Sequence, residues 1–256
     1  MADGFPFAEN ALTGRHAVVC GASKGIGAAA AMMLAKAGCR ITAVSRNPSI
    51  DDLPGEGNVA FALDLEDNDA VKDFADSITD VDILINNAAG PPGGPLIDSE
   101  IEDFSAPIQR HLFASHTLTK AFVPKMEARG YGRIVNVIST SVREPIPNIG
   151  LSNTLRGAMA SWAKSLSREL PTCITINNVL PGFTNTERLD SLAKSINEKT
   201  GKSIDEIHSN WMSQVPIERL IDPMETGAAI AFLCMPISGG IRGVSLAVDG
   251  GRMRSI

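Results

Sequence analysis

The sequence predicts an α/β protein with one doubly wound, parallel sheet of about seven strands. Short apolar segments alternate with longer segments that have a helical pattern over the 256 residues. A glycine-rich turn, Cys20 to Gly27, joins the first apolar segment to the first helical one. Polar residues follow several later strand segments, and parallel α/β sheets bind ligands at the ends of such strands.

The strands are expected where short apolar or β-branched segments stop at glycine, proline or polar residues. These segments are residues 17–19, 40–45, 59–63, 81–85, 133–138, 174–180 and 244–248.

The helices are expected between these strands, at residues 28–36, 66–79, 101–129, 152–169 and 222–235. The third should bend near Pro107 and Pro124, because proline removes a helical hydrogen bond. The last begins at a strong signal, since Asp222 can cap the helix and Glu225 can complete a capping box. Residues 187–215 are polar and helix-prone, and we expect a mobile substrate flap there.

Composition excludes several classes of protein. Apolar residues make up 44% of the chain and charged residues 20%, which is typical of a globular protein. The net charge of −6 argues against general nucleic-acid binding. No apolar run is long enough for a membrane span, and the N-terminal residues lack a signal segment. The four cysteines show no metal-ligand spacing, so we expect reduced thiols, a cytoplasmic location and no metal.

The glycine turn predicts a phosphate-binding site. Strand, glycine turn and helix together aim backbone N–H groups and the positive end of a helix dipole at an anion. Gly21, Gly25 and Gly27 would allow a tight turn, close approach of a ligand and close helix–strand packing. Ser23, Lys24 and Ile26 complete the candidate binding residues. The alternative is an ordinary strand–helix turn that contains glycine.

The end of the second strand favours NADP(H) over NAD. In dinucleotide-binding folds this position meets the adenosine ribose, where an acidic residue favours a free hydroxyl and arginine favours a phosphate. Arg46 follows the strand, no acidic residue stands at its tip, and Lys24 adds a second cation nearby. Both could also be solvated surface charges.

From residue 13 to the C-terminus the chain resembles the short-chain dehydrogenase/reductase family, of the 3-oxoacyl-acyl-carrier-protein reductase type. The motifs that carry the resemblance are the glycine turn, Asp64, Asn86-Asn87-Ala88-Ala89-Gly90, Ser139, Pro181-Gly182 with Thr186, and Val248-Asp249-Gly250-Gly251. Cys20, where the family usually has Thr, and the extra Ala89 are small departures. The resemblance implies a single dinucleotide-binding Rossmann domain over residues 1–256, and a homodimer or homotetramer formed through the helices that begin near Ile101 and Ser152. It also implies further cofactor contacts at Asp64, Leu65, Asn87, Ala88, Arg156, Pro181, Gly182, Thr184 and Thr186.

The resemblance breaks at the catalytic residues. The family pattern of Asn, Ser, Tyr and Lys falls here on His111, Ser139, Ser152 and Arg156. The chain has one tyrosine, Tyr131, which precedes the fifth strand and should lie at the far end of the sheet. A serine hydroxyl is a poor general acid by itself, although Ser139 and Ser152 could anchor a substrate oxygen. Arg156 keeps a positive charge but cannot give up its proton.

His111 is the one member of this set that could titrate near neutral pH, directly or through Ser139, Ser152 or water. The alternative is a helix histidine that bonds to a backbone carbonyl.

Three functions follow from this pattern. The first is an NADP(H)-dependent oxidoreductase that acts on a small carbonyl compound or alcohol, 3-oxoacyl-like, with an altered proton relay. The second is a lyase, isomerase or hydratase on the same fold. The third is a non-catalytic protein that binds NADP(H).

Overall fold

A seven-stranded parallel sheet forms the centre of the computed structural model, which describes residues 7–255. The order β3-β2-β1-β4-β5-β6-β7 is doubly wound and places a topological switch point between β1 and β4, as predicted. The strands are β1 (His16–Cys20), β2 (Arg40–Ser45), β3 (Val59–Ala62), β4 (Ile83–Asn86), β5 (Gly132–Val137), β6 (Ile174–Pro181) and β7 (Ser245–Val248).

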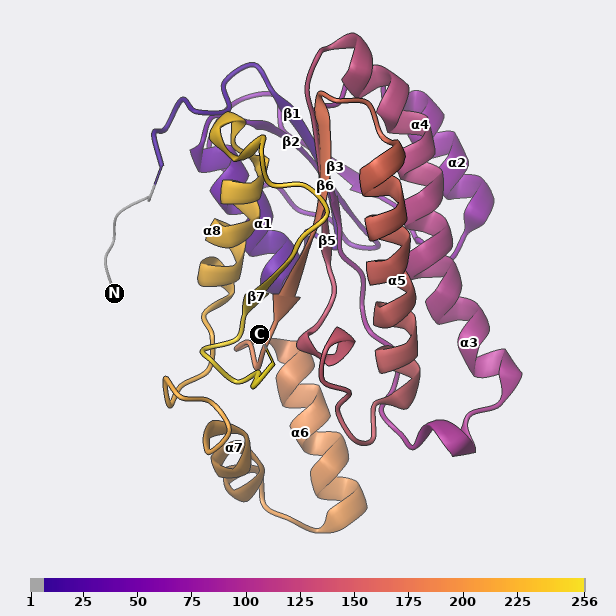
Figure 1. Ribbon diagram of the computed structural model, residues 1–256, viewed down its shortest axis with the longest axis vertical. Helices are drawn as coiled ribbons and strands as arrows, with labels where there is room; N and C mark the ends of the chain where they lie inside the picture. The colour runs from indigo at the N-terminus through magenta and orange to yellow at the C-terminus, as the bar shows by residue number, and fades with distance from the viewer. Residues whose placement is uncertain (1–6, 256) are drawn as a thin grey trace.

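Helices cover both faces of the sheet (Figure 1). On one face lie α1 (Gly25–Lys36) and α8 (Pro223–Cys234), which pack on each other and on the sheet. On the other face lie α2 (Asn68–Ser77), α4 (Ala114–Ala128) and α5 (Gly150–Glu169). The strands β1, β4, β5 and β6 are almost wholly buried, because each is covered on both sides.

The start of α8 confirms its sequence signal. Asp222 accepts a hydrogen bond from the backbone N–H of Met224, and Glu225 accepts one from the N–H of Asp222. Pro223 occupies the first turn, where its missing N–H costs nothing.

The long helix predicted over residues 101–129 is present, with a π-helical turn inside it. It consists of α3 (Ile101–Ile108), a π-helical turn (Gln109–Phe113) and α4, which continues through Pro124. The wide turn directly follows Pro107, whose ring nitrogen cannot donate to the preceding turn. This turn carries His111.

Residues 187–215, which the sequence predicts to be helix-prone, form a pair of helices. The helices α6 (Glu187–Thr200) and α7 (Ile204–Met212) lie beyond the carboxyl ends of the strands, at the bottom of Figure 1. They have an apolar cluster of their own, made by Leu189, Ala193, Ile207 and Trp211. The role of this segment as a mobile substrate flap stays a prediction.

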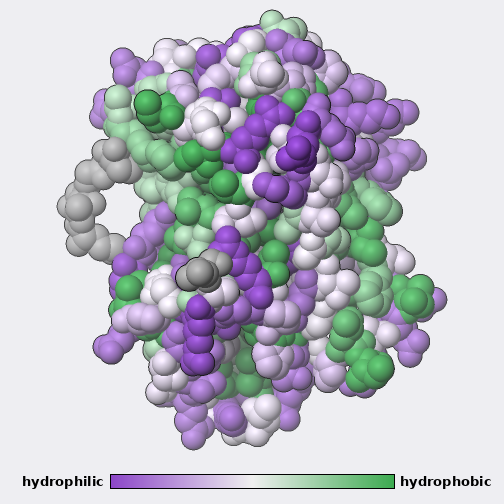
Figure 2. Space-filling model, viewed as in Figure 1, coloured by the Kyte–Doolittle hydropathy of each residue, from purple (hydrophilic) through white to green (hydrophobic). Residues whose placement is uncertain are grey.

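The surface is mixed in character. Figure 2 shows mostly hydrophilic residues on the viewed face, with apolar residues gathered at the lower right, where α3 lies in Figure 1. Exposed apolar side chains of this region include Ile97 and Ile101, which are 92% and 78% exposed. Among residues 7–255, no helix has the length and apolar character needed to cross a lipid bilayer.

Candidate active site

A cleft of about 810 Å³ opens at the carboxyl ends of the strands. It is lined by the turns that follow β1, β2, β4, β5 and β6, together with the first turns of α5 and α6. Of the predicted site residues, all except Gly27 and His111 line it: Gly21, Ser23, Lys24, Gly25, Ile26, Arg46, Asp64, Leu65, Asn87, Ala88, Ser139, Ser152, Arg156, Pro181, Gly182, Thr184 and Thr186.

The glycine turn packs closely against the start of α1 and against Asn87. A Cβ atom on Gly27 would lie 2.0 Å from the carbonyl oxygen of Gly21, so only glycine fits there. Gly21 itself has φ of +63° and lies against Asn87. The Asn87 amide donates to the carbonyl oxygens of Cys20 and Gly21, 3.3 Å from each. Gly27 thus allows the close packing of α1 on the turn, while residues 21–26 of the turn face the cleft, Ala22 excepted.

The start of α1 suits an anion. Lys24, at the N-cap, makes no side-chain cap, and the first turn contains no acidic residue. The first N–H groups of the helix therefore have no capping side chain, and the helix dipole adds positive potential. Because Gly21 and Gly25 have no side chain and also line the cleft, the backbone of the turn can be approached closely, and the residues present fit the diphosphate of a dinucleotide.

The two predicted contacts for a ribose phosphate differ in their surroundings. Arg46 lines the cleft and forms no ion pair among the described residues. Lys24 instead pairs across the cleft with Glu187 of α6, with its Nζ 2.5 Å from a carboxylate oxygen. Both side chains of the pair are exposed, so solvent screens the interaction.

The substituted catalytic group is assembled in the cleft. Ser139 follows β5, and its Oγ accepts a hydrogen bond from the N–H of Ser141 at 3.1 Å. Ser152 and Arg156 lie one turn apart on α5, and both line the cleft. Arg156 is only 8% exposed, and its Nη1 donates to the Val137 carbonyl at 2.8 Å. Burial and the nearby Arg188 and Arg110 lower the pKa of Arg156 to about 10, which keeps it charged at neutral pH.

His111 bonds to a backbone carbonyl, which is the alternative that the sequence left open. Its Nε2 lies 3.0 Å from the Ala89 carbonyl, which fixes it as the donor of that hydrogen bond. Burial, and then the charge of Arg156, lower the pKa of His111 well below its usual value. This environment favours the alternative, a helix histidine that bonds to a backbone carbonyl, over a group that titrates near neutral pH. His111 lies behind the cleft wall, beside a cavity of about 10 Å³ that Asn87 and Arg156 also border.

Tyr131 is far from this chemistry, as predicted. It precedes β5 at the amino ends of the strands, and its hydroxyl donates to the carbonyl of Cys234. The guanidinium groups of Arg15 and Arg133 lie over its ring at 4.0 and 4.2 Å. Burial raises its pKa further, so this phenol cannot serve the cleft.

Three arginines that line the cleft were not predicted from the sequence: Arg110, Arg188 and Arg252. Arg188 stands two residues after Thr186, and Arg110 directly precedes His111, so each adjoins a predicted position. Their position next to predicted site residues was the one sequence signal that could have identified Arg110 and Arg188. The direction in which each side chain points depends on tertiary packing.

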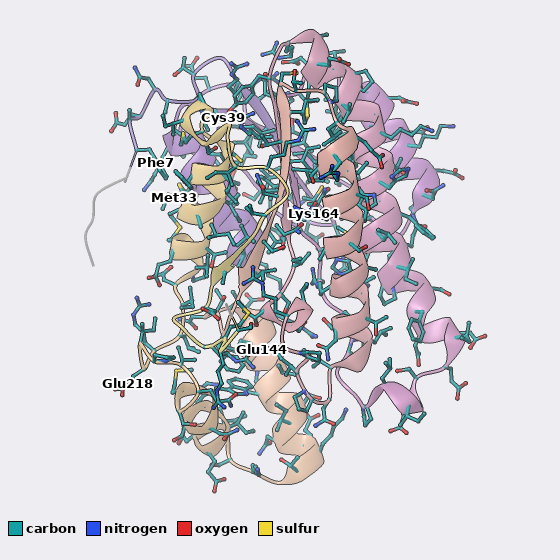
Figure 3. The ribbon with its side chains drawn as sticks, in the orientation of Figure 1. Phe7, Met33, Cys39, Glu144, Lys164 and Glu218 are labelled. Carbon is teal, nitrogen blue, oxygen red and sulfur yellow. The ribbon has the colours of Figure 1, made fainter. Side chains whose placement is uncertain are left out.

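The C-terminal segment borders the cleft. The Glu144 carboxylate, labelled in Figure 3, accepts hydrogen bonds from the N–H groups of Arg254 and Ser255, each at 2.7 Å. Arg252 donates to the Thr140 hydroxyl, and its guanidinium lies 5.0 Å from the centre of the Phe183 ring. This segment therefore contributes one of the charges that face the cleft.

A row of buried amide side chains links four neighbouring strands of the sheet. Asn86 donates to Asn136, Asn136 donates to Asn178, and Asn178 donates to Ser245. The row crosses the sheet from the last residue of β4, through β5 and β6, to the first residue of β7. Within residues 7–255, no group of acidic, histidine or cysteine side chains is placed to hold a metal ion.

Comparison with known proteins agrees with this geometry. A family model described as enoyl-(acyl carrier protein) reductase matches residues 21–252. The chain is 34% identical over 251 residues to the 3-oxoacyl-[acyl-carrier-protein] reductase FabG of Vibrio cholerae, covering 94% of this chain and 98% of that protein. It is 29% identical over 256 residues to the NADPH-dependent reductase BacG of Bacillus subtilis, covering 94% and 99%.

A solved structure extends the likeness to three dimensions. The L-sorbose reductase from Gluconobacter frateurii, complexed with NADPH and L-sorbose, has a TM-score of 0.89 and 25% identity, covering 97% of this chain and 100% of that one. The fold, the glycine turn and the cleft thus agree with matches over nearly the whole chain. The chain belongs to the short-chain dehydrogenase/reductase family.

Proposed function

We propose that this protein is an NADP(H)-dependent oxidoreductase that interconverts a small 3-oxoacyl-like carbonyl compound and its alcohol. The observation that carries the proposal is the cleft itself, where an uncapped helix start faces the same space as Ser139, Ser152 and Arg156. The NADPH dependence of BacG and the NADPH bound to L-sorbose reductase support the choice of cofactor.

Different residues of the cleft would contact different parts of the cofactor. The turn over residues 21–27 would hold the diphosphate, and Arg46 would contact the phosphate of the adenosine ribose. Asp64 and Leu65, after β3, would border the adenine. Arg156 and Thr186 would hold the nicotinamide half, together with the Asn87 and Pro181 turns.

The chemistry requires a hydride and a proton. When bound, reduced nicotinamide supplies the hydride to the carbonyl carbon. The hydroxyls of Ser139 and Ser152 would donate hydrogen bonds to the carbonyl oxygen, while the Arg156 charge stabilises the negative charge that develops there. A solvent water would then supply the proton, directly or across the Ser152 hydroxyl, so that the alkoxide becomes an alcohol. Arg156 stays protonated throughout.

This arrangement favours some substrates over others. Without a tuned phenol, the cleft provides charge stabilisation but no strong general acid. We therefore propose that it acts on carbonyl groups whose reduced oxygen is stabilised electrostatically and needs little help from a proton donor. His111 is given no proton-transfer step, because its Nε2 hydrogen is engaged by Ala89.

The proposal is tested first by calorimetric titration of the purified protein with NADPH and with NADH. We expect NADPH to bind at least about tenfold more tightly, a difference of roughly 1.4 kcal/mol. Arg46→Asp should remove this preference, whereas Lys36→Asp, on the same protein but outside the cleft lining, should keep it. Equal binding of both nucleotides would contradict the role of Arg46, and binding of neither would contradict the proposed function. Tight binding without turnover of any carbonyl or alcohol would favour a non-catalytic NADP(H)-binding protein.

A further inference from the structure

We propose that the substrate carries a carboxylate, and that Arg188 of α6 binds it with a two-pronged hydrogen bond. This inference rests on the proposed function and specifies the substrate class of the same cleft. It makes Arg188 a specificity-determining residue, and it identifies the substrate as a small oxo acid or hydroxy acid.

The cleft has a charge opposite to that of the whole protein. The chain has a net charge of −6, yet cationic side chains outnumber carboxylates along the cleft. The cations are Lys24, Arg46, Arg110, Arg156, Arg188 and Arg252, and the carboxylates are Asp64, Glu66 and Glu187. Such a cleft attracts anions and repels cations.

Pairing leaves four of these arginines without an ion pair among the described residues: Arg46, Arg156, Arg188 and Arg252. Lys24 pairs with Glu187, and Arg110 pairs with Glu66. Among the residues that the structure describes, no carboxylate lies within ion-pair distance of Arg156 or Arg188.

Two of these unpaired guanidinium groups, those of Arg156 and Arg188, are neighbours. A Cβ atom built on Gly90 would lie 3.7 Å from Nη2 of Arg156 and 3.8 Å from Nη2 of Arg188. Their hydrogen bonds to described residues go to backbone carbonyls, from Arg156 to Val137 and from Arg188 to Pro91 at 2.6 Å. A guanidinium has five N–H donors, so most of them have no partner among these residues.

Like charges held this close are unfavourable without an anion between or beside them. Burial is the main cause that lowers the pKa of Arg156, and the charges of Arg188 and Arg110 lower it further. A bound carboxylate would relieve the repulsion between these charges and would accept two parallel hydrogen bonds from one guanidinium.

The cofactor phosphates are expected elsewhere in the cleft. Glu187 and Arg188 are adjacent on α6 but diverge, because neighbouring helical residues project in different directions. Glu187 reaches Lys24 in the glycine turn, whereas Arg188 reaches Pro91 in the turn that follows β4. Arg188 therefore lies with Arg156, at the catalytic end, and is available to the substrate.

The test compares acids with their esters. Calorimetry on enzyme saturated with NADP⁺ would measure binding of acetoacetate and levulinate, each against its methyl ester, since oxidised cofactor cannot reduce either ketone. We expect each acid to bind at least about tenfold more tightly than its ester, a difference of roughly 1.4 kcal/mol. Arg188→Met should abolish the preference for the acid. Arg188→Lys should keep part of it, because lysine keeps the positive charge but cannot donate two parallel hydrogen bonds.

Matched controls separate the outcomes. Lys194→Met removes an exposed cation from the same helix outside the cleft lining and should leave all four affinities unchanged. Equal binding of acid and ester, or no binding of either, overturns the proposal. A loss of NADPH affinity in Arg188→Met equal to the loss of acid affinity also overturns it, because Arg188 would then serve a cofactor phosphate. Failure of the unmodified protein to bind NADPH would instead contradict the proposed function.

Discussion

Arg156 occupies the position where the resemblance places a lysine, and it changes what the site can do. Lysine can lower the pKa of a neighbouring phenol, but this cleft has Ser152 instead of a phenol. The buried guanidinium keeps its charge and donates to the Val137 carbonyl, so it is fixed in direction. Such a fixed charge stabilises an oxyanion without taking part in proton exchange.

Removal of this charge should abolish most of the turnover. We expect Arg156→Ala to lower kcat/KM by about 10²–10³, the usual cost of losing one preorganised oxyanion donor. Arg156→Lys should retain part of the activity. The measurement is steady-state reduction of acetoacetate with NADPH, with Arg168→Ala, an exposed position on the same helix, as the matched control. Unchanged activity in Arg156→Ala would remove Arg156 from the catalytic group.

Some single-residue predictions followed from sequence and others did not. The isolation of Tyr131 was predictable, because its place before the fifth strand puts it at the end opposite the cleft. For His111 the sequence offered a backbone carbonyl as one possible partner, but it did not identify that partner, because Ala89 lies 22 positions away.

At the level of elements, local signals identified most of the fold. All seven strands lie within a few residues of the predicted segments, because buried parallel strands form short apolar runs. The start of α8 was visible in Asp222 and Glu225, whose side chains make the expected capping bonds. These features depend on neighbours in the sequence.

Some details of the predicted elements depend on long-range contacts or on weaker local signals. The helix over residues 101–129 was expected to bend near its two prolines, and the structure adds a π-helical turn directly after Pro107. The pair α6 and α7 does carry local signals, namely Gly201 with φ of +71° and the Ser203–Glu206 capping box. These signals separate two helices, but they do not show that the first turn of α6 reaches the glycine turn through Glu187 and Lys24.

The molecule as a whole separates its charges. Acidic residues dominate the total, while cations dominate the cleft, so the attraction of an anion is local. Association between copies of the chain stays a prediction. The exposed apolar residues Ile97, Ile101 and Phe113 lie near α3 and the start of α4, one of the regions where the resemblance places that contact.

Two buried histidines predict how stability depends on pH. Burial is the main cause that lowers the pKa of His16 and of His111, so both are neutral in the folded protein. In the unfolded chain each titrates near about 6.5. Above that pH neither state binds a proton, and stability is complete. As the pH falls below it, the unfolded state takes up protons first and stability declines by up to about 1.4 kcal/mol per pH unit for each histidine.

Urea unfolding between roughly pH 7.5 and 5.5 measures this decline. The free energy of unfolding should fall on acidification, and His111→Gln, which can still donate to Ala89, should show a shallower slope. The hydrogen bond from Arg219 also lowers the pKa of Glu225. The stability that this pair contributes is lost only when the pH falls below the ordinary pKa of a glutamate carboxyl, which lies outside this window. A free energy that stays constant over the window would contradict the neutral, buried state of both histidines.

The central claim is that hydride transfer persists in a cleft without a phenol. The most direct measurement is to supply NADPH deuterated at C4 of the nicotinamide, on both faces, together with acetoacetate and an uncharged 3-oxoacyl thioester. The products are then analysed by mass spectrometry. The account predicts an alcohol that carries one deuterium on the carbon that was the carbonyl, formed faster from the acid than from the thioester. An altered product without deuterium would show non-redox chemistry on this fold, and the absence of any labelled alcohol would contradict the claim.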